Sequence, residues 1–305
     1  MTRKPLPRPV QPGSRLAVVA PAGPFDEEAF RAGLAWLGER YEVVHRPDIF
    51  AKTGYLAGDD ARRLGELLDA VADPSVDAVV CARGGFGATR LLPGIDPALV
   101  REANKMIVGF SDITALHSVW ARAGVRSIHA PMVAALGCAS DTLRERWIDT
   151  LEHPGIARSW DLCPLNPKPR PVSGLLAGGN LAVLGALVGT PFAPRLEGRI
   201  LFIEDVGERP YRIDRILTTM KQAGGLQGLA GLVVGAFTEG DPGPDGVSIE
   251  EVLTDHFGDA PFPVLTGFPA GHIAENEPIP LGAEAVIEDG RLDIRPASPD
   301  ADLLT

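Results

Sequence analysis

The chain has 305 residues, which exceeds one average domain and suggests two. Hydrophobic residues make up 45% and charged residues 23% of it, a composition that excludes a disordered protein, a collagen and a coiled coil. The 40 acidic and 29 basic side chains give a net charge of −11, so nucleic acid is not expected as the main partner, whereas a small molecule or a peptide is compatible with this charge.

The first half of the chain alternates short apolar runs with amphipathic stretches. The apolar runs predict strands, and the amphipathic stretches predict helices, the first of which Asp26 can cap. Such alternation is typical of a parallel sheet covered on both faces, and we assign it to a first domain over residues 1–162. The predicted strands are 16–20, 41–44, 78–81, 106–108 and one around Ile128, with helices at 26–40, 59–72 and elsewhere between them.

A proline-rich stretch then interrupts the pattern. Four prolines between Cys163 and Pro171 cannot continue a helix or an inner strand, so we expect a stiff linker over residues 163–173. A second, smaller domain over residues 174–305 is expected to be mixed α+β, because its helices and strands follow one another in mixed order. Its predicted elements are a Gly-rich helix, strands at 200–203 and 232–234, a helix at 211–222 and a closing hairpin at Asp289–Gly290.

Residues 171–194 carry no charged side chain and could be mistaken for a membrane span. Gly185 and Gly189 even form the G-x-x-x-G spacing that is common in membrane helices. Further glycines and Pro191 interrupt the stretch, so it falls short of a continuous apolar span. We therefore predict a tightly packed interior helix and expect no membrane partner.

The chain has only three cysteines, Cys81, Cys138 and Cys163, and they lie far apart. Without a C-x-x-C pair they predict neither a disulfide framework nor a structural zinc site. A reducing compartment fits this usage best, and no metal or other cofactor is expected.

One candidate for chemistry is Ser111, which follows the strand ending at Gly109. Ligands in open α/β sheets bind at the carboxyl ends of strands, and free N–H groups at the start of the next helix favour developing negative charge. However, Ser111 could equally be a helix N-cap, and this segment alone favours the cap. It does not match the G-x-S-x-G elbow, because Ile113 occupies the place of the second glycine.

A second candidate is the glycine-rich run of residues 82–87, Ala-Arg-Gly-Gly-Phe-Gly, after the strand at 78–81. Its glycines allow a ligand close to the backbone, where N–H groups can hold a phosphate or an oxyanion. It is not G-x-G-x-x-G, because Arg90 takes the last position, and a tight strand-to-helix turn explains it equally well.

The third candidate combines distant pieces. Glu204 and Asp205 follow a strand and could orient a histidine, and His272 lies in a polar loop after a glycine. Strand alternation directs the two carboxylates to opposite faces, so only one of them can be the partner. The residues themselves do not decide between His272 and two histidines nearer to Ser111 in sequence, His117 and His129.

Taken together, these segments closely resemble the LD-carboxypeptidase family of serine peptidases, the muramoyltetrapeptide carboxypeptidases, which includes the microcin C immunity hydrolase. The matching segments occur in family order and span nearly the whole chain. They are Val19-Ala-Pro-Ala-Gly23, Gly54-Tyr-Leu-Ala-Gly58, Arg83-Gly-Gly-Phe-Gly87, Gly109-Phe-Ser-Asp-Ile-Thr114, Gly179-Asn-Leu181, Leu201-Phe-Ile-Glu-Asp-Val206, Gly271-His272 and Pro280-Leu-Gly282.

The resemblance implies a Ser-His-Glu triad at Ser111, His272 and Glu204, the family pattern favouring Glu204 over Asp205. Ser111 would attack the scissile carbonyl, His272 would carry the proton, and Glu204 would orient the imidazole. The backbone N–H groups of Gly85 and Asp112 would then hold the oxyanion.

Two further residues are assigned to substrate binding, Arg83 and Phe86. The Arg83 guanidinium could bind the terminal carboxylate of the substrate, although a surface ion pair is an equal expectation. Phe86 stands where tyrosine is common in the family, and Ile273 replaces the glycine that often follows the histidine. Both departures could reshape the pocket.

The family resemblance also implies a fold and a role. It implies a flavodoxin-like N-terminal domain with a smaller C-terminal domain, in a cytoplasmic homodimer that needs no metal. The implied reaction is removal of the terminal D-amino acid from a murein tetrapeptide during murein recycling. Two alternatives stand beside this interpretation. One is hydrolysis of an aminoacyl- or peptidyl-nucleotide amide, as in microcin C immunity, and the other is a small-ligand-binding protein in which Ser111 is only a cap.

Overall fold

A computed structural model describes residues 7, 9–166 and 170–296 of the chain. The chain divides into two compact units. Of the described residues, the first unit contains those up to Pro154 and Glu277–Pro280, and the second unit contains Gly155–Asn276 and residues 281–296.

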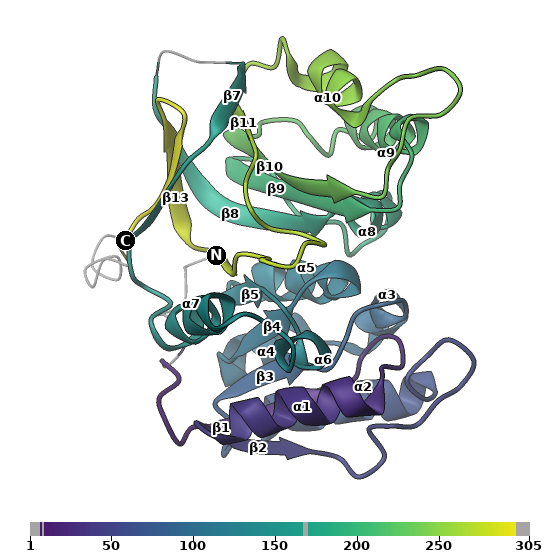
Figure 1. Cartoon of the computed structure of the whole chain (residues 1–305), viewed down its shortest axis with the longest axis vertical. Coiled ribbons are helices and arrows are strands. Elements are labelled where there is room, and N and C mark those ends of the chain that lie inside the picture. Colours follow the sequence, from purple (N-terminus) through teal and green to yellow (C-terminus); the bar gives the residue numbers. More distant parts are fainter. Residues whose placement is uncertain (1–6, 8, 167–169, 297–305) are drawn as a thin grey trace. The chain divides into compact units, whose positions relative to one another are not determined.

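The first unit is a doubly wound α/β domain around one sheet, with strand order β12-β5-β4-β3-β1-β2 (Figure 1). From β2 to β5 all neighbouring strands pair in parallel. The order 2-1-3-4-5 is that of flavodoxin-like folds, which confirms the predicted fold class. The elements are β1 (Arg15–Val19), α1 (Glu27–Gly38), β2 (Glu42–His45), α2 (Asp60–Ala72), β3 (Ala78–Cys81), α3 (Ala88–Leu91), α4 (Pro97–Ala103), β4 (Met106–Gly109), α5 (Thr114–Ala123), β5 (Ser127–His129), α6 (Val133–Leu136), α7 (Asp141–Glu152) and β12 (Ile279–Leu281).

Burial explains why these segments fold as predicted. All four residues of β3 and all four of β4 are buried, as expected for inner strands covered on both faces. Asp26 caps α1, as predicted, by accepting a hydrogen bond from the N–H of Ala29. The edge strand β12 comes from far along the chain, and next to it Glu277 pairs with Arg146 of α7 at 3.0 Å.

The second unit contains a mixed sheet with strand order β6-β14-β13-β8-β9-β10-β11-β7. The four strands from β8 to β11 run parallel, and the outer ones pair antiparallel, as predicted for a mixed domain. The predicted hairpin is confirmed, with Asp289 and Gly290 both at positive φ between β13 and β14. The elements are β6 (Arg158–Asp161), β7 (Cys163–Asn166), β8 (Val172–Asn180), α8 (Leu181–Ala186), β9 (Arg199–Val206), α9 (Pro210–Gln222), β10 (Gly231–Thr238), α10 (Ile249–Phe257), β11 (Val264–Thr266), β13 (Glu284–Glu288) and β14 (Arg291–Ile294).

The expected linker over residues 163–173 differs from the structure. Its first four residues form β7, which pairs with β11 at the edge of the second sheet. Proline is tolerated there because an edge strand can leave one side of its backbone unpaired. The boundary also moves, because β6 lies within the expected first domain but pairs with β14 of the second unit. Residues 167–169 of the expected linker lie outside the described residues.

The predicted Gly-rich interior helix within 171–194 is also wrong. Residues 172–180 form the inner strand β8, and only the short helix α8 follows. The glycines suit a strand because β9 passes very close, and a side chain at Gly178 would overlap the carbonyl oxygen of Phe202. Among the described residues, no helix has the length and apolarity needed to cross a bilayer.

Helix α1 contains a matched pair of glycines that tests how closely α1 packs on α6. Gly33 is buried against α6, and an added Cβ would overlap the carbonyl oxygen of Val133, whereas a Cβ at Gly38 would meet open space. Glycine-to-alanine in a helix is ordinarily stabilising by about 0.5–1 kcal/mol. We expect Gly38→Ala to raise the free energy of unfolding by that amount and Gly33→Ala to lower it by about 1–3 kcal/mol. Urea denaturation measures both, and an equal effect of the two substitutions would contradict the close approach of α1 and α6.

Candidate active site

Ser111 occupies a strained turn between β4 and α5. Its φ of 62° lies in the left-handed region, which a residue with a side chain enters only at a cost of about 1–3 kcal/mol. Ser111 begins a short 3-10 turn with Asp112 and Ile113, whose N-cap is Phe110, and the N-cap of α5 is Ile113. The interpretation of Ser111 as a simple helix cap is therefore wrong. A strained serine between a strand and a helix is instead typical of a nucleophile elbow.

The side chain of His117 is hydrogen-bonded to the backbone just before this turn. Its Nε2 lies 2.8 Å from the carbonyl oxygen of Gly109, the last residue of β4. Burial lowers the pKa of His117 to about 4, so the ring is neutral at physiological pH and donates through Nε2–H. His129 is fully buried, with its ring 5.6 Å from that of Phe110. His117 thus holds the end of β4, and the ring of His129 packs against Phe110.

The glycine-rich turn lies directly against the serine. A Cβ at Gly84 would come within 3.2 Å of Ser111 Oγ, so only glycine leaves the hydroxyl its present space. The carbonyl oxygen of Gly84 accepts a hydrogen bond from the N–H of Gly23 at 2.9 Å. Gly85 has a φ of 105° and is exposed, and its N–H makes no hydrogen bond within the described part of the chain. That N–H can therefore donate a hydrogen bond to a ligand oxygen.

The side chain of Asp112 points back to the same turn. It is buried, and its Oδ2 accepts a hydrogen bond from the N–H of Ala88 at 2.7 Å. Burial raises the pKa of Asp112 to about 6, and the N–H of Ala88 and the charge of Arg63 oppose that rise. The sequence prediction assigned only the backbone of Asp112 to the site.

Arg83 and Phe86 lie on the exposed part of this turn. Arg83 Nη1 donates to the carbonyl oxygen of Pro24 at 3.0 Å, so the expected alternative of a surface ion pair is replaced by a bond to the backbone. Phe86 is 48% exposed and packs on Tyr55, which is 67% exposed, with ring centroids 5.8 Å apart. The sequence prediction missed Tyr55, although it lies in the Gly54–Gly58 stretch that carries the family resemblance.

In the second unit a buried carboxylate meets an imidazole. Glu204, near the end of β9, is fully buried, and its Oε2 lies 2.7 Å from Nδ1 of His272. The other carboxylate oxygen, Oε1, has no hydrogen-bond partner among the described residues. Ionised carboxylates are rarely buried without a partner, so this bond fixes the orientation of the ring.

The loop that carries His272 can pass over Glu204 only because residue 271 is glycine. Gly271 has a φ of 128°, and a Cβ there would lie 2.9 Å from Glu204 Oε2. The N–H of Gly271 donates to Oδ1 of the buried Asn276 at 2.8 Å, and Thr238 Oγ1 reaches the carbonyl oxygen of His272 at 3.4 Å. The sequence prediction missed Asn276, which stands four residues after His272.

Asp205 has a different task. Its Oδ1 accepts a hydrogen bond from Asn180 Nδ2 at 2.9 Å, and its Oδ2 accepts one from the N–H of Ala182 at 2.8 Å. It therefore fixes the turn from β8 into α8, and its burial raises its pKa above the ordinary value. Of the two adjacent carboxylates, Glu204 is the one that is hydrogen-bonded to His272.

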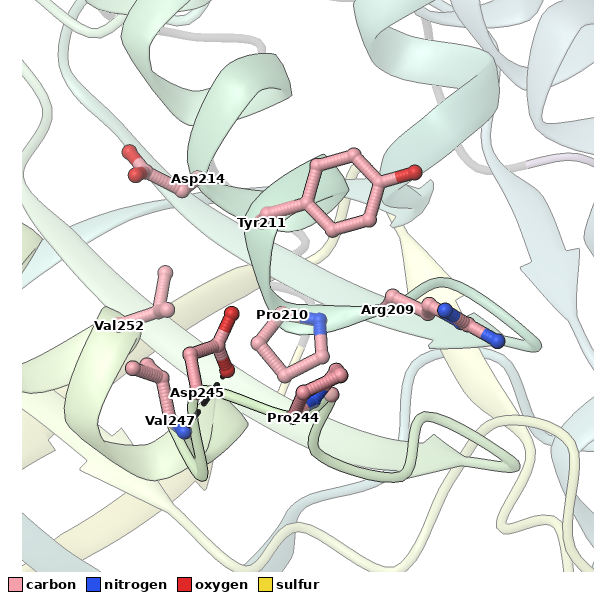
Figure 2. A pocket seen from close by; sticks show the side chains of 9 residues that line it. Arg209, Pro210, Tyr211, Asp214, Pro244, Asp245, Val247 and Val252 are labelled. Carbon is pink, nitrogen blue, oxygen red and sulfur yellow. Dashed lines mark hydrogen bonds between the residues drawn. The ribbon is translucent and has the colours of Figure 1, made fainter.

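A separate pocket of about 280 Å³ lies in the second unit at the start of α9 (Figure 2). Figure 2 shows Arg209, Tyr211 and Asp245 among the side chains that line it, and none of the candidate site residues belongs to its lining. Within the described residues, no group of three or more His, Cys, Asp or Glu side chains is arranged to hold a metal ion.

Comparison with known proteins matches both parts of the chain. The family model of the LD-carboxypeptidase N-terminal domain matches residues 16–130, and that of the LD-carboxypeptidase C-terminal domain matches residues 173–287. The murein tetrapeptide carboxypeptidase of Pseudomonas aeruginosa is 32% identical over 293 residues, which cover 91% of this chain and 94% of that protein.

Solved structures show the same likeness. The crystal structure of muramoyltetrapeptide carboxypeptidase from Oxalobacter formigenes aligns with a TM-score of 0.84 and 30% identity, covering 93% of this chain and 100% of that one. The microcin C7 self-immunity protein in complex with aspartyl sulfamoyl adenosine aligns with a TM-score of 0.85, covering 96% of this chain and 99% of that one. Its identity of 22% supports a common fold only.

The raised pKa of Asp112 predicts a pH-dependent stability. Because the folded-state pKa of about 6 exceeds the ordinary 3.8, folding favours the protonated form, and its stabilising effect is lost as pH rises from about 4 through about 6. The shift corresponds to at most about 3 kcal/mol. We expect Asp112→Asn, measured by thermal melts, to gain stability relative to wild type as pH rises over this interval.

The control for this experiment is Asp141→Asn in α7, whose side chain is 94% exposed. It should follow the wild-type pH profile. Parallel profiles for Asp112→Asn and the wild type would show that the carboxyl of Asp112 ionises as it does in the unfolded chain.

Proposed function

Because the chain belongs to the LD-carboxypeptidase family of serine-type peptidases, we propose that it removes the terminal D-amino acid of a murein tetrapeptide through Ser111, His272 and Glu204. The observation that carries the proposal is the 2.7 Å contact between the buried Glu204 carboxylate and Nδ1 of His272. In this proposal the ring proton lies on Nδ1, facing Glu204, and Nε2 is the basic nitrogen.

The proposed reaction has two halves. Ser111 Oγ attacks the carbonyl carbon of the scissile bond while Nε2 of His272 accepts the hydroxyl proton. The tetrahedral oxyanion is held by the N–H groups of Gly85 and Asp112, and it collapses as His272 passes the proton to the leaving amine of the D-amino acid. Water then attacks the acyl-serine ester with His272 again as base, which releases the shortened peptide and restores the serine. The proposal requires that Ser111 Oγ come within hydrogen-bonding reach of Nε2, about 2.6–3.2 Å.

Substrate recognition is proposed for the exposed side chains of the glycine-rich turn. Arg83 uses one guanidinium nitrogen on the carbonyl of Pro24, and its remaining N–H groups can bind the terminal carboxylate of the peptide. Phe86 would supply apolar contact beside it. A role in murein recycling, in the cytoplasm and as a homodimer, is part of the same proposal, and sedimentation of the purified chain tests the dimer.

The serine is tested by removing its hydroxyl. We expect Ser111→Ala to lower the rate of D-alanine release from a murein tetrapeptide by at least about 10³-fold, because no nucleophile remains. The matched control is Ser118→Ala in α5, whose hydroxyl bonds only to the carbonyl of Thr114 among the described residues, and which should retain near wild-type turnover. Release by Ser111→Ala at the wild-type rate would rule out the mechanism.

The carboxylate–imidazole pair is tested by a double-mutant cycle. Glu204→Gln should lower kcat by about 10²–10⁴-fold with little change in KM, because the amide no longer fixes the reactive tautomer. His272→Ala should lower it at least as far, and the double variant no further, since residues that act as a unit are non-additive. Losses that multiply in the double variant would mean that the two residues act independently.

The two proposed substrate classes are separated by assaying the wild type on a murein tetrapeptide and on aspartyl sulfamoyl adenosine. A tetrapeptide with a terminal L-residue, assayed beside them, tests the preference for a terminal D-residue.

A further inference from the structure

The peptide bond between Gly87 and Ala88 is held from both sides by buried charged side chains. The carbonyl oxygen of Gly87 accepts a hydrogen bond from Arg63 Nη1 at 2.8 Å. The N–H of Ala88 donates to Asp112 Oδ2 at 2.7 Å. The relative exposure of Arg63 is 0% and that of Asp112 is 3%, so both bonds form away from solvent.

Each holding side chain is itself anchored. Arg63 Nη1 also donates to the carbonyl oxygen of Pro21 at 2.5 Å, and Arg63 Nη2 pairs with Asp60 at the start of α2. Asp112 follows Ser111 directly in the 3-10 turn. The Gly87–Ala88 peptide is thereby linked to the backbone of the serine through one side chain and to α2 through the other.

Burying two charged side chains costs more free energy than closing a turn requires. Burial lowers the pKa of Arg63 and raises that of Asp112, so each is held against its preference for water. Replacing buried ionic groups by well-packed apolar ones is often neutral or stabilising. Strongly perturbed charged groups concentrate at functional sites, and Asp112 directly follows Ser111 in the chain.

The turn between these anchors carries the N–H of Gly85, which makes no hydrogen bond to any described residue. At its other end, Gly84 is fixed by its hydrogen bond to Gly23 and lies against Ser111 Oγ. The exposed residues Gly85 and Phe86 are therefore held on both sides, although glycine-rich backbone is otherwise flexible. A Cβ at Gly87 would meet Arg63 Nη1 at 2.5 Å, so glycine is required for the guanidinium to reach this carbonyl.

We propose that Arg63 and Asp112 are positioning residues that hold the Gly84–Gly87 turn against Ser111, so that the N–H of Gly85 meets the oxyanion at the correct place. The inference rests on the proposed function and extends it to two side chains that make no contact with the substrate. A displacement of about 1 Å in such a donor can lower turnover about 10²-fold.

The test uses the whole chain with Asp112→Asn and Arg63→Met. Asparagine removes the charge and so weakens the acceptor that holds the N–H of Ala88, and methionine fills the space of Arg63 without a donor. Both variants should lower kcat by about 10–100-fold and leave KM within about threefold. Affinity for a peptide aldehyde, which forms a tetrahedral adduct on the serine, should fall by the same factor as kcat. Arg63→Lys should recover part of the loss, because lysine can still donate to Gly87.

Two further measurements separate positioning from simple support of the fold. Hydrogen exchange at residues 84–88 should quicken in both variants, although the Tm of Asp112→Asn at pH 7.5 should not fall below that of wild type. Arg90→Gln is the matched control, since Arg90 pairs with the same Asp60 at 2.7 Å but its side chain does not hold the turn. It should leave kcat and exchange unchanged.

The outcomes are distinguishable. Unchanged exchange in both variants overturns the holding role, whatever the substrate is. Faster exchange with unchanged kcat and aldehyde affinity overturns the positioning role. If the wild type releases no D-amino acid, the proposed function fails, and aldehyde affinity together with exchange still decides the role of Arg63 and Asp112.

Discussion

A carboxylate removed from water is expensive unless a hydrogen-bond donor meets it, and in the second unit that donor is the imidazole of His272. The residues around this bond have conformations that serve it. Gly271 adopts a φ that removes a clash with Glu204, and Asn276 fixes the N–H of Gly271. Asp205 instead accepts hydrogen bonds from Asn180 and from the N–H of Ala182 at the start of α8, so Glu204 is the carboxylate that meets the ring. One hydrogen bond therefore decides the conformation of the strand end and of the loop above it.

In the first unit the corresponding constraint is the backbone of Ser111, which must adopt a positive φ that is unfavourable for serine. Ser111 stays at positive φ because contacts fix its neighbours: His117 holds the carbonyl of Gly109, and Ile113 packs where a side chain at 109 would stand. Strain at one residue is retained only where its neighbours over-determine it. The strained conformation of Ser111 therefore depends on the contacts that hold its neighbours.

The sequence was sufficient for the strands β1 to β5 of the first sheet because inner strands buried on both faces are apolar throughout, as in 78–81 and 106–109, but it did not predict β12, which joins this sheet from far along the chain. At 172–180 the glycines predict part of a packed helix, whereas they allow close contact between two strands. At Pro164 the sequence predicts a linker, whereas this proline lies in an edge strand, which tolerates it. The choice between Glu204 and Asp205 needed register, since both are buried and adjacent. Arg63 could not be found at all, because nothing in a helical pattern marks a side chain that reaches a distant turn.

The return of β12 to the first sheet has a consequence for how this protein can be made. This strand borders β5, yet it is encoded after almost the whole second unit. During synthesis on the ribosome, β5 therefore lacks its partner strand β12 until residue 281 has emerged. A gene fragment cut at the apparent boundary after Pro154 would leave that border bare, and bare strand borders invite association between copies. The two units are separable by their contacts but not by a single cut in the polypeptide.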